Sequence, residues 1–95
     1  MFKILIVDDD PTIRRLLERT LKKQGYDLYV AEDGVEGFEV ACRERPSLIV
    51  CDWMMPRMDG IEVCRRIRAE PELSTTFMIL LTSLGSVEDR VRGLD

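Results

Sequence analysis

Three aspartates are the residues best suited to chemistry in this 95-residue sequence. Asp8 and Asp9 directly follow one short apolar run, residues 2–7, and Asp52 directly follows another, residues 48–51. Uncompensated carboxylates that lie close together repel one another, and at least one of them then has a raised pKa. Mg²⁺ prefers oxygen ligands and typically takes one or two carboxylates together with a phosphate. If the two runs are neighbouring strands, the three carboxylates therefore form a candidate Mg²⁺ site for phosphoryl chemistry.

The apolar runs have the composition of buried strands. Residues 48–51 are all apolar and include β-branched side chains, which suits a strand covered on both faces of a parallel sheet. Residues 27–31 and 77–81 form two further runs, the first expected to be less buried than residues 2–7. In open parallel sheets, ligands bind beyond the carboxyl ends of the strands, where Asp52 falls. Asp52 is thus either a cap for the following loop or the reactive group of a site.

Helical segments separate the strands, and several begin where a residue can cap the first turn. Asp10 precedes Pro11, whose fixed φ suits the first helical position, and Asp33 with Glu36 forms a capping-box-like pair. Asp59 is expected to be a loop or helix cap. The residues expected to face the core are, helix by helix, Ile13, Leu16, Leu17 and Leu21; Val35, Phe38 and Cys42; Ile61, Cys64 and Ile67; and Val87, Val91 and Leu94. The polar side of the first helix is expected to hold Arg14, Arg15, Glu18 and Lys22.

The alternation of strands and helices predicts an α/β fold. A strand followed by a helix occurs four times along the chain, without repeats or low-complexity linkers. With right-handed crossovers, this order gives a parallel sheet with helices on both faces. The length corresponds to one domain.

Charge and composition narrow the classes of function. The net charge of −4 and the lack of a dense run of Lys or Arg argue against a nucleic-acid surface. No apolar run approaches the roughly 20 residues of a membrane helix, and the start lacks a signal-peptide pattern, so a cytoplasmic location is expected. The three cysteines, without His or a Cys-x-x-Cys motif, fit neither a zinc site nor a disulfide framework. Cys42, Cys51 and Cys64 are predicted to be small core residues.

Taken together, the motifs resemble the receiver domain of two-component response regulators. The resemblance covers the whole chain and is carried, in order, by Ile6-Val7-Asp8-Asp9; by Asp52 with Met55-Pro56 and Asp59-Gly60; and by Leu80-Leu81-Thr82-Ser83. It implies a flavodoxin-like doubly wound sheet, here with four strands in the order 2-1-3-4. Family receivers continue through a fifth strand, which carries a Lys-Pro pair, and a fifth helix. Residues 1–95 are therefore predicted to be a receiver domain that lacks its C-terminal strand and helix.

The same resemblance assigns roles to the candidate site. Asp52 is the expected phosphoacceptor, a carboxylate nucleophile that forms an acyl phosphate. Asp9 is expected to bind Mg²⁺ directly, together with Asp52 and the backbone carbonyl of Met54. Asp8 supports the metal through water. Thr82, at the end of the fourth strand, is the expected switch hydroxyl that bonds a phosphoryl oxygen.

These roles predict a signalling domain rather than an enzyme. It would take a phosphoryl group from a sensor histidine kinase or a phosphotransfer protein and switch an output domain encoded in the full gene, with self-phosphotransfer and autodephosphorylation as its only reactions. Without the family lysine, phosphorylation can be impaired while metal binding survives, which leaves a pseudo-receiver that docks proteins as an alternative. A second alternative is a Mg²⁺-dependent aspartyl-phosphate phosphatase of the haloacid dehalogenase type. Such enzymes need a second Asp two residues after the nucleophile, where this chain has Met54, and that difference argues against a phosphatase.

Two surface features complete the expectations. The exposed Arg65, Arg66 and Arg68 of the third helix either dock an acidic partner or form a solvated face. Residues 77–81 would be a sheet edge without Lys, Glu or Pro to protect it, and such an edge invites pairing with another chain. Self-association of the chain is therefore predicted. The side chains expected to be exposed by an uncovered sheet face are Val7 and Ile79 or Leu81.

Overall fold

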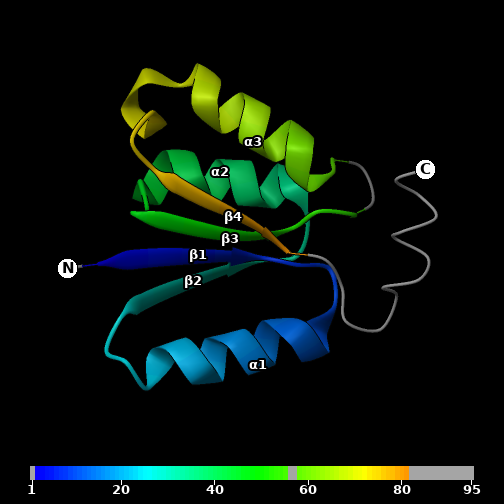
Figure 1. Cartoon of the computed structure of the whole chain (residues 1–95), viewed down its shortest axis with the longest axis vertical. Helices are drawn as coiled ribbons and strands as arrows, with labels where there is room; N and C mark the ends of the chain where they lie inside the picture. The colour runs from blue at the N-terminus through cyan, green and yellow to red at the C-terminus, as the bar shows by residue number, and fades with distance from the viewer. Residues whose placement is uncertain (1, 56–57, 82–95) are drawn as a thin grey trace.

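Four parallel strands form the centre of the structure, a computed structural model that describes residues 2–55 and 58–81 (Figure 1). The order across the sheet is β2-β1-β3-β4, as predicted. Each strand also lies within one residue of its predicted bounds. The strands are β1 (Lys3–Val7), β2 (Asp27–Ala31), β3 (Leu48–Asp52) and β4 (Phe77–Leu81).

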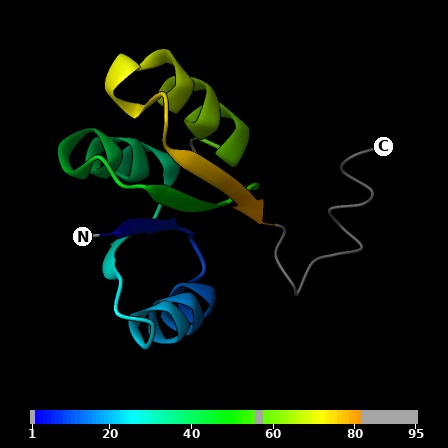
Figure 2. The same cartoon turned by 60° about the vertical axis from the view of Figure 1, so that its left-hand side comes forward.

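Among the described residues, three α-helices cover the two faces of this sheet, which confirms the predicted layers. The helices are α1 (Pro11–Lys22), α2 (Gly34–Glu44) and α3 (Gly60–Ala69). Figure 2 shows α1 alone on one face, beneath β1 and β2, and shows α2 and α3 together on the other. A short 3₁₀ turn, η1 (Pro71–Leu73), lies between α3 and β4, and it buries Leu73. The fourth helix predicted after Ser86 lies outside the described residues.

A carboxylate closes the first turn of every described α-helix, as the sequence predicted. These side chains accept hydrogen bonds from backbone N–H groups that have no partner within the helix. The pairs are Asp10 Oδ1 with the N–H of Thr12 at 2.8 Å, Asp33 Oδ1 with that of Glu36 at 2.9 Å, and Asp59 Oδ1 with that of Glu62 at 2.9 Å. The caps fix where each helix begins relative to the strand before it.

The two central strands carry the core. β1 and β3 are buried along most of their length on both faces, whereas β2 is less buried, as predicted. Between the sheet and the α2–α3 layer, the larger cluster contains Leu5, Val7, Ile49 and Cys51 together with Val40, Ala41, Val63, Ile67 and Leu73. On the α1 side, Ile4, Ile6 and Val50 form a smaller cluster, against which Leu17 and Leu21 of α1 pack.

The predicted core faces of the helices are wrong in part. Leu16 and Ile61 are each 53% exposed, and Val35 and Cys42 are also exposed. The buried residues of α2 include two glycines, which a count of apolar side chains overlooks: Gly34 faces Met58 and, in α3, Val63, and Gly37 faces Val7 of β1. A Cβ on Gly37 would lie 2.8 Å from Val7 Cγ2, so the helix approaches β1 too closely for a side chain there. Because of this close contact, the side of α2 that carries Gly37 faces the sheet, and not the side that the apolar periodicity predicted.

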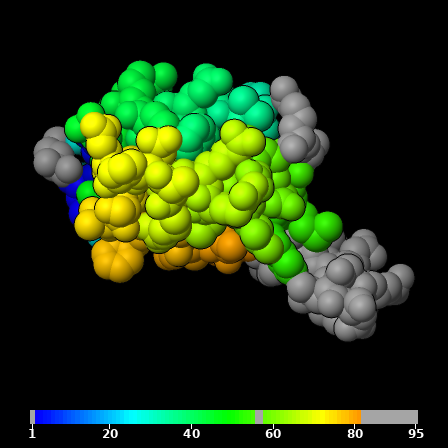
Figure 3. Space-filling view, turned by 90° about the horizontal axis from the view of Figure 1, so that it is seen from above, coloured from blue at the N-terminus to red at the C-terminus, as the bar shows by residue number. Residues whose placement is uncertain are grey.

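Strand β4 presents an apolar edge. Phe77 is 73% exposed and Ile79 is 46% exposed, and among the described residues β4 pairs with β3 alone. Figure 3 shows β4, in orange, at the margin of the molecule beside α3. The expected exposure of Ile79 is confirmed, but that of Val7 is wrong, because Val7 is fully buried. The strand register places Val7 beside Cys51 and Ile79 beside Val50, so the two side chains point to opposite faces.

Candidate functional site

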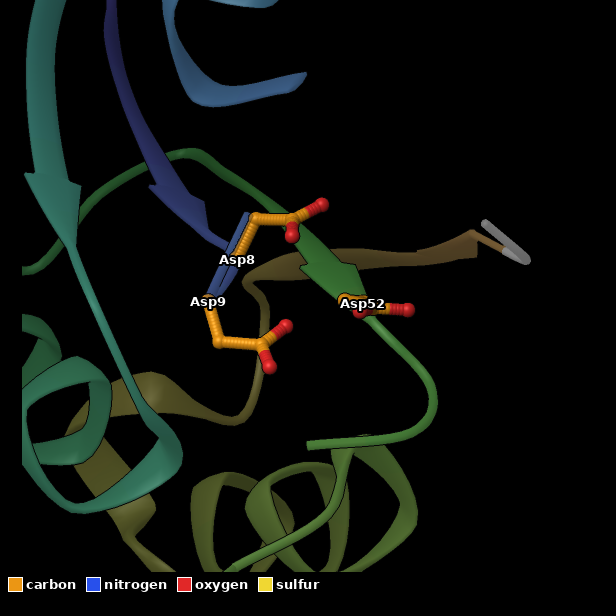
Figure 4. A group of neighbouring side chains, drawn as sticks. All are labelled: Asp8, Asp9 and Asp52. Atoms are coloured by element: carbon orange, nitrogen blue, oxygen red, sulfur yellow. The ribbon is translucent and has the colours of Figure 1, made fainter. Parts of the chain in front are cut away.

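Asp8, Asp9 and Asp52 converge beyond the carboxyl ends of β1 and β3 (Figure 4). Each offers a carboxylate oxygen, and these oxygens all lie within 4.8 Å of one another. The register explains the convergence, because Val7 of β1 pairs with Cys51 of β3 and the next residue on each strand is an aspartate. The prediction that the three carboxylates meet at one sheet edge is therefore confirmed.

The cluster brings three carboxylates together in a largely buried position. Asp8 and Asp52 are only 5% and 4% exposed, whereas Asp9 is exposed. The pKa of the Asp8 carboxyl is raised from 3.8 to about 6, chiefly by burial and also by the neighbouring charges of Asp52 and Asp9, which together outweigh the lowering effect of a hydrogen bond from the Asp10 N–H. A divalent cation that prefers oxygen ligands relieves such repulsion. The residues present thus fit a Mg²⁺ site, with carboxylates from two adjacent strand ends.

Close backbone packing holds Asp52 in place. The N–H of Trp53 donates to the carbonyl oxygen of Leu81 at 2.9 Å, which ties the residue after Asp52 to the end of β4. The N–H of Gly60 donates to the carbonyl oxygen of Trp53 at 2.8 Å. A Cβ on Gly60 would lie 2.5 Å from the Asp52 carbonyl oxygen, so α3 can begin this close to the site only with glycine.

Two predicted site residues are only partly addressed by the structure. The N–H of Met54 donates to Asp52 Oδ1 at 3.4 Å, so the Met54 backbone does lie against the acceptor carboxylate. Its carbonyl oxygen as a metal ligand stays a prediction. Thr82 lies outside the described residues. It directly follows Leu81, whose register partner across the sheet is Asp52.

Arg14 belongs to the site, although the sequence analysis placed it on the polar face of the first helix. Its Nη1 donates to the backbone carbonyl oxygen of Asp8 at 2.8 Å, and its side chain is only 18% exposed. Helical side chains lean back toward the helix N-terminus, so a residue one turn after the N-cap Asp10 covers the preceding loop. The place of Arg14 one turn after the N-cap was the sequence signal that could have predicted this contact. Helical periodicity alone places Arg14 on the polar face and does not reveal the contact.

The cysteines follow the prediction only in part. Cys51 is fully buried, and burial, followed by the charges of Asp52 and Asp8, raises the pKa of its thiol to about 12. Such a thiol is protonated and inert at neutral pH. Cys64 is partly buried, and Cys42 is exposed, which contradicts its predicted place in the core. Burial followed by the charges of Glu70 and Glu72 raises the Cys42 pKa as well, so this thiol is not activated either.

The arginines of α3 form ion pairs and hydrogen bonds with nearby groups of the same chain. Arg65 Nη2 and Arg66 Nε lie 2.7 Å and 3.0 Å from the carboxylate oxygens of Glu62. Arg68 Nη1 donates to the carbonyl oxygen of Thr76 at 2.6 Å. These contacts favour a solvated, internally paired face over a docking site for an acidic partner. In the part of the chain that the structure describes, no helix is both long and apolar enough to cross a membrane.

Comparison with known proteins matches the sequence to one family. Residues 4–95 match the family described as the response regulator receiver domain. The chain is 46% identical over 93 residues to the response regulator MprA of Mycobacterium leprae, covering 98% of this chain and 40% of that protein. It is 40% identical over 95 residues to RpaA of Synechocystis, a DNA-binding dual master transcriptional regulator, covering all of this chain and 39% of that protein. The chain thus spans about two fifths of the length of these relatives.

Solved structures show the same fold. The chemotaxis response regulator CheY4 of Vibrio cholerae superposes with a TM-score of 0.84 at 34% identity, over 99% of this chain and 78% of that chain. The receiver domain of a signal transduction histidine kinase from Syntrophus aciditrophicus superposes with a TM-score of 0.81 at 39% identity, over 100% of this chain and 72% of that chain. The four-stranded order and the alternating helices are therefore a CheY-like arrangement.

Replacing Asp8 by Asn is expected to stabilise the metal-free protein at neutral pH. The folded-state pKa of about 6 lies above the ordinary 3.8, so the folded protein holds this proton more tightly than the unfolded chain does. Wild-type stability should therefore fall as the pH rises from about 4 through about 6. At pH 7 Asp8→Asn should raise the free energy of unfolding by about 1–3 kcal/mol, since one pKa unit corresponds to about 1.4 kcal/mol.

Urea unfolding in a chelating buffer, at several pH values, measures this effect. Glu39→Gln, at an exposed position of α2, is the control and should change stability little. A wild-type stability that is flat over this pH range, or an Asp8→Asn variant no more stable than wild type at pH 7, would contradict the prediction.

Proposed function

The chain belongs to the receiver domain family of response regulators, and from this premise we propose that Asp52 accepts a phosphoryl group from a protein donor with the help of Mg²⁺. Receiver domains of this family are signalling modules rather than enzymes. The observation that carries the proposal is the convergence of Asp8, Asp9 and Asp52 within 4.8 Å at the ends of adjacent strands. The proposed location is the cytoplasm.

In the proposed reaction, Asp52 is the nucleophile. One of its carboxylate oxygens attacks the phosphorus of a phosphohistidine on the donor, and an O–P bond forms as the N–P bond breaks. The released imidazole nitrogen takes up a proton, and Asp52 becomes an acyl phosphate. The tight backbone packing at Trp53 and Gly60 supports this role, because it fixes the direction from which the carboxylate meets the donor.

All three carboxylates would take part in holding the metal. Asp9 and Asp52 would bind Mg²⁺ directly, with the backbone carbonyl of Met54, and Asp8 would hold it through water. When bound, Mg²⁺ neutralises the charge of the carboxylates and of the transferring phosphoryl group. We place the switch at Thr82, whose hydroxyl would bond a phosphoryl oxygen, because it follows the register partner of Asp52 on β4.

The surface of α1 supports a protein as the donor, a sensor histidine kinase or a phosphotransfer protein. α1 begins two residues after Asp9, and its outer face has a hollow lined by Thr12, Arg15, Leu16 and Arg19. An exposed leucine between two arginines suits an apolar and acidic protein surface better than a small phosphorylated molecule. In the full-length protein, an output domain would receive the signal.

A pseudo-receiver that only docks proteins is the alternative function. A test of phosphorylation separates this alternative from the phosphoacceptor, because a pseudo-receiver would not be phosphorylated. A test of metal binding does not separate them, because the carboxylates can bind Mg²⁺ in either case. The retention of all three acidic residues in one cluster favours the phosphoacceptor.

Mg²⁺ is expected to quench the fluorescence of Trp53, the only tryptophan, because it adjoins Asp52. Saturation should fall in the millimolar range, on the order of 1 mM for a carboxylate and water site. Asp9→Asn should weaken the binding by removing a direct ligand. Asp27→Asn, at the opposite end of the sheet, is the matched control and should titrate as wild type does. An Asp9→Asn titration that superimposes on the wild-type curve would remove Asp9 from the proposed ligands.

Incubation with phosphoramidate and Mg²⁺ should add one phosphoryl group to the chain. The Asp52→Asn variant should gain none, because it lacks the nucleophile, and Asp27→Asn should be modified like wild type. Intact-mass spectrometry measures the gain, and treatment with hydroxylamine should remove it, as expected of an acyl phosphate. Mg²⁺ binding without any gain of mass would support the docking alternative, and a gain in Asp52→Asn would exclude Asp52 as the acceptor.

We also propose that the 95-residue chain self-associates through the edge of β4. Light scattering across a dilution series should show dimers or larger species that dissociate on dilution. Ile79→Lys should shift the equilibrium to the monomer, because it places a charge on the exposed face of the edge strand. Ile61→Lys, at a similarly exposed isoleucine of α3, should leave the association unchanged. A wild-type chain that remains monomeric at high concentration refutes the proposal.

A further inference from the structure

Arg14 links the loop that carries two of the carboxylates to the body of the protein. We propose that Arg14 is a positioning residue, whose guanidinium holds the β1–α1 loop in the conformation in which Asp8 and Asp9 face Asp52. The inference rests on the proposed function, since it concerns the metal and phosphoryl site defined there. It adds a residue that is neither a metal ligand nor an acceptor.

The contacts of Asp8 show how the loop is held. Its backbone N–H donates to the carbonyl oxygen of Ala31 at 3.2 Å, and its Oδ1 accepts from the N–H of Asp10 at 2.9 Å. Its backbone carbonyl oxygen accepts from Arg14 Nη1 at 2.8 Å. This oxygen belongs to the planar peptide unit that joins Asp8 to Asp9. Arg14 therefore fixes the orientation of the peptide from which both carboxylates extend.

The second arm of the guanidinium reaches another loop. Arg14 Nη2 lies 3.8 Å from Glu32 Oε1, and the backbone N–H of Glu32 donates to Glu36 Oε1 at 2.7 Å. The Glu32 side chain is 77% exposed, so solvent screens this ion pair and it contributes little. The hydrogen bond to the Asp8 carbonyl, made by a side chain that is only 18% exposed, is the contact that carries the proposal.

The sign of the effect on Mg²⁺ affinity separates positioning from simple charge. A fixed positive charge beside a divalent cation repels it, so removing that charge would strengthen Mg²⁺ binding if charge alone mattered. Removing a residue that positions the ligands weakens binding instead. Arg14→Met deletes the charge and the donors while keeping a long side chain, so it sets the two effects against each other.

The experiment compares Mg²⁺ titrations of the full chain by Trp53 fluorescence. Arg14→Met should raise the dissociation constant by about tenfold, the lower range for loss of a residue that orients metal ligands. Lys22→Met, which removes an exposed positive charge near the other end of α1, is the matched control and should bind as tightly as wild type or slightly tighter. Arg14→Lys should fall between wild type and Arg14→Met, because lysine keeps the charge but not the planar fork.

A second measurement needs no metal. In a chelating buffer, the amide of Asp10 should exchange its hydrogen faster in Arg14→Met than in wild type, because its hydrogen bond to Asp8 Oδ1 depends on the held loop. If Arg14→Met does not fold by circular dichroism, Arg14→Lys decides, with an affinity weaker by a few-fold and faster exchange at Asp10 expected. Wild-type affinity and exchange in the folded variant, or tighter binding, would overturn the inference. A wild-type chain that does not bind Mg²⁺ would instead contradict the proposed function.

Discussion

Mutual repulsion among three carboxylates is the constraint to which the rest of this structure responds. Asp8, Asp9 and Asp52 place their oxygens within 4.8 Å of one another, and two of the three are buried. Burial and like charges both oppose ionisation, and the raised pKa of Asp8 reports that cost. Backbone contacts at Asp8 and at Trp53 hold the carboxylates in this arrangement. The geometry of the site therefore depends on the rigidity of the strands and helices that carry these residues.

The fold supplies that rigidity through its two central strands. Asp8 and Asp9 directly follow β1, and Asp52 ends β3; these are also the strands with core packing on both faces. Glycine permits the closest approaches: α2 meets β1 at Gly37, and α3 begins against the Asp52 carbonyl at Gly60. Neither glycine has a positive φ, so close packing rather than backbone conformation explains each of them. Stability and site geometry thus depend on the same contacts.

The strands and the acidic cluster were predictable because their signals are local. Each strand is a short apolar run, and Asp52 directly follows one of them, so its place at a sheet edge needs no tertiary information. The adjacency of β1 and β3 is not local and came from the resemblance to a family. Which side of each helix faces the sheet is also not a local property. Leu16 and Ile61 fit an apolar stripe in the sequence but are exposed, because contacts with the sheet and at the glycines decide which side packs. The place of Arg14 in the site was not predicted, because its contact with the Asp8 carbonyl oxygen depends on how far and in which direction its side chain extends.

The contacts around Asp52 also connect the site to β4, the neighbouring strand at the edge of the described sheet. Trp53 donates its N–H to Leu81 of β4 and accepts at its carbonyl from the N–H of Gly60, the first residue of α3. The backbone beside the acceptor is therefore shared with two elements that form the exposed margin of the molecule. Charge added to Asp52 would act on a peptide unit that β4 and α3 both hold, at the Leu81 end of the strand whose Ile79 and Phe77 side chains are exposed further from the site. The same short segment thus joins the Asp52 carboxylate to the strand that carries the exposed apolar edge.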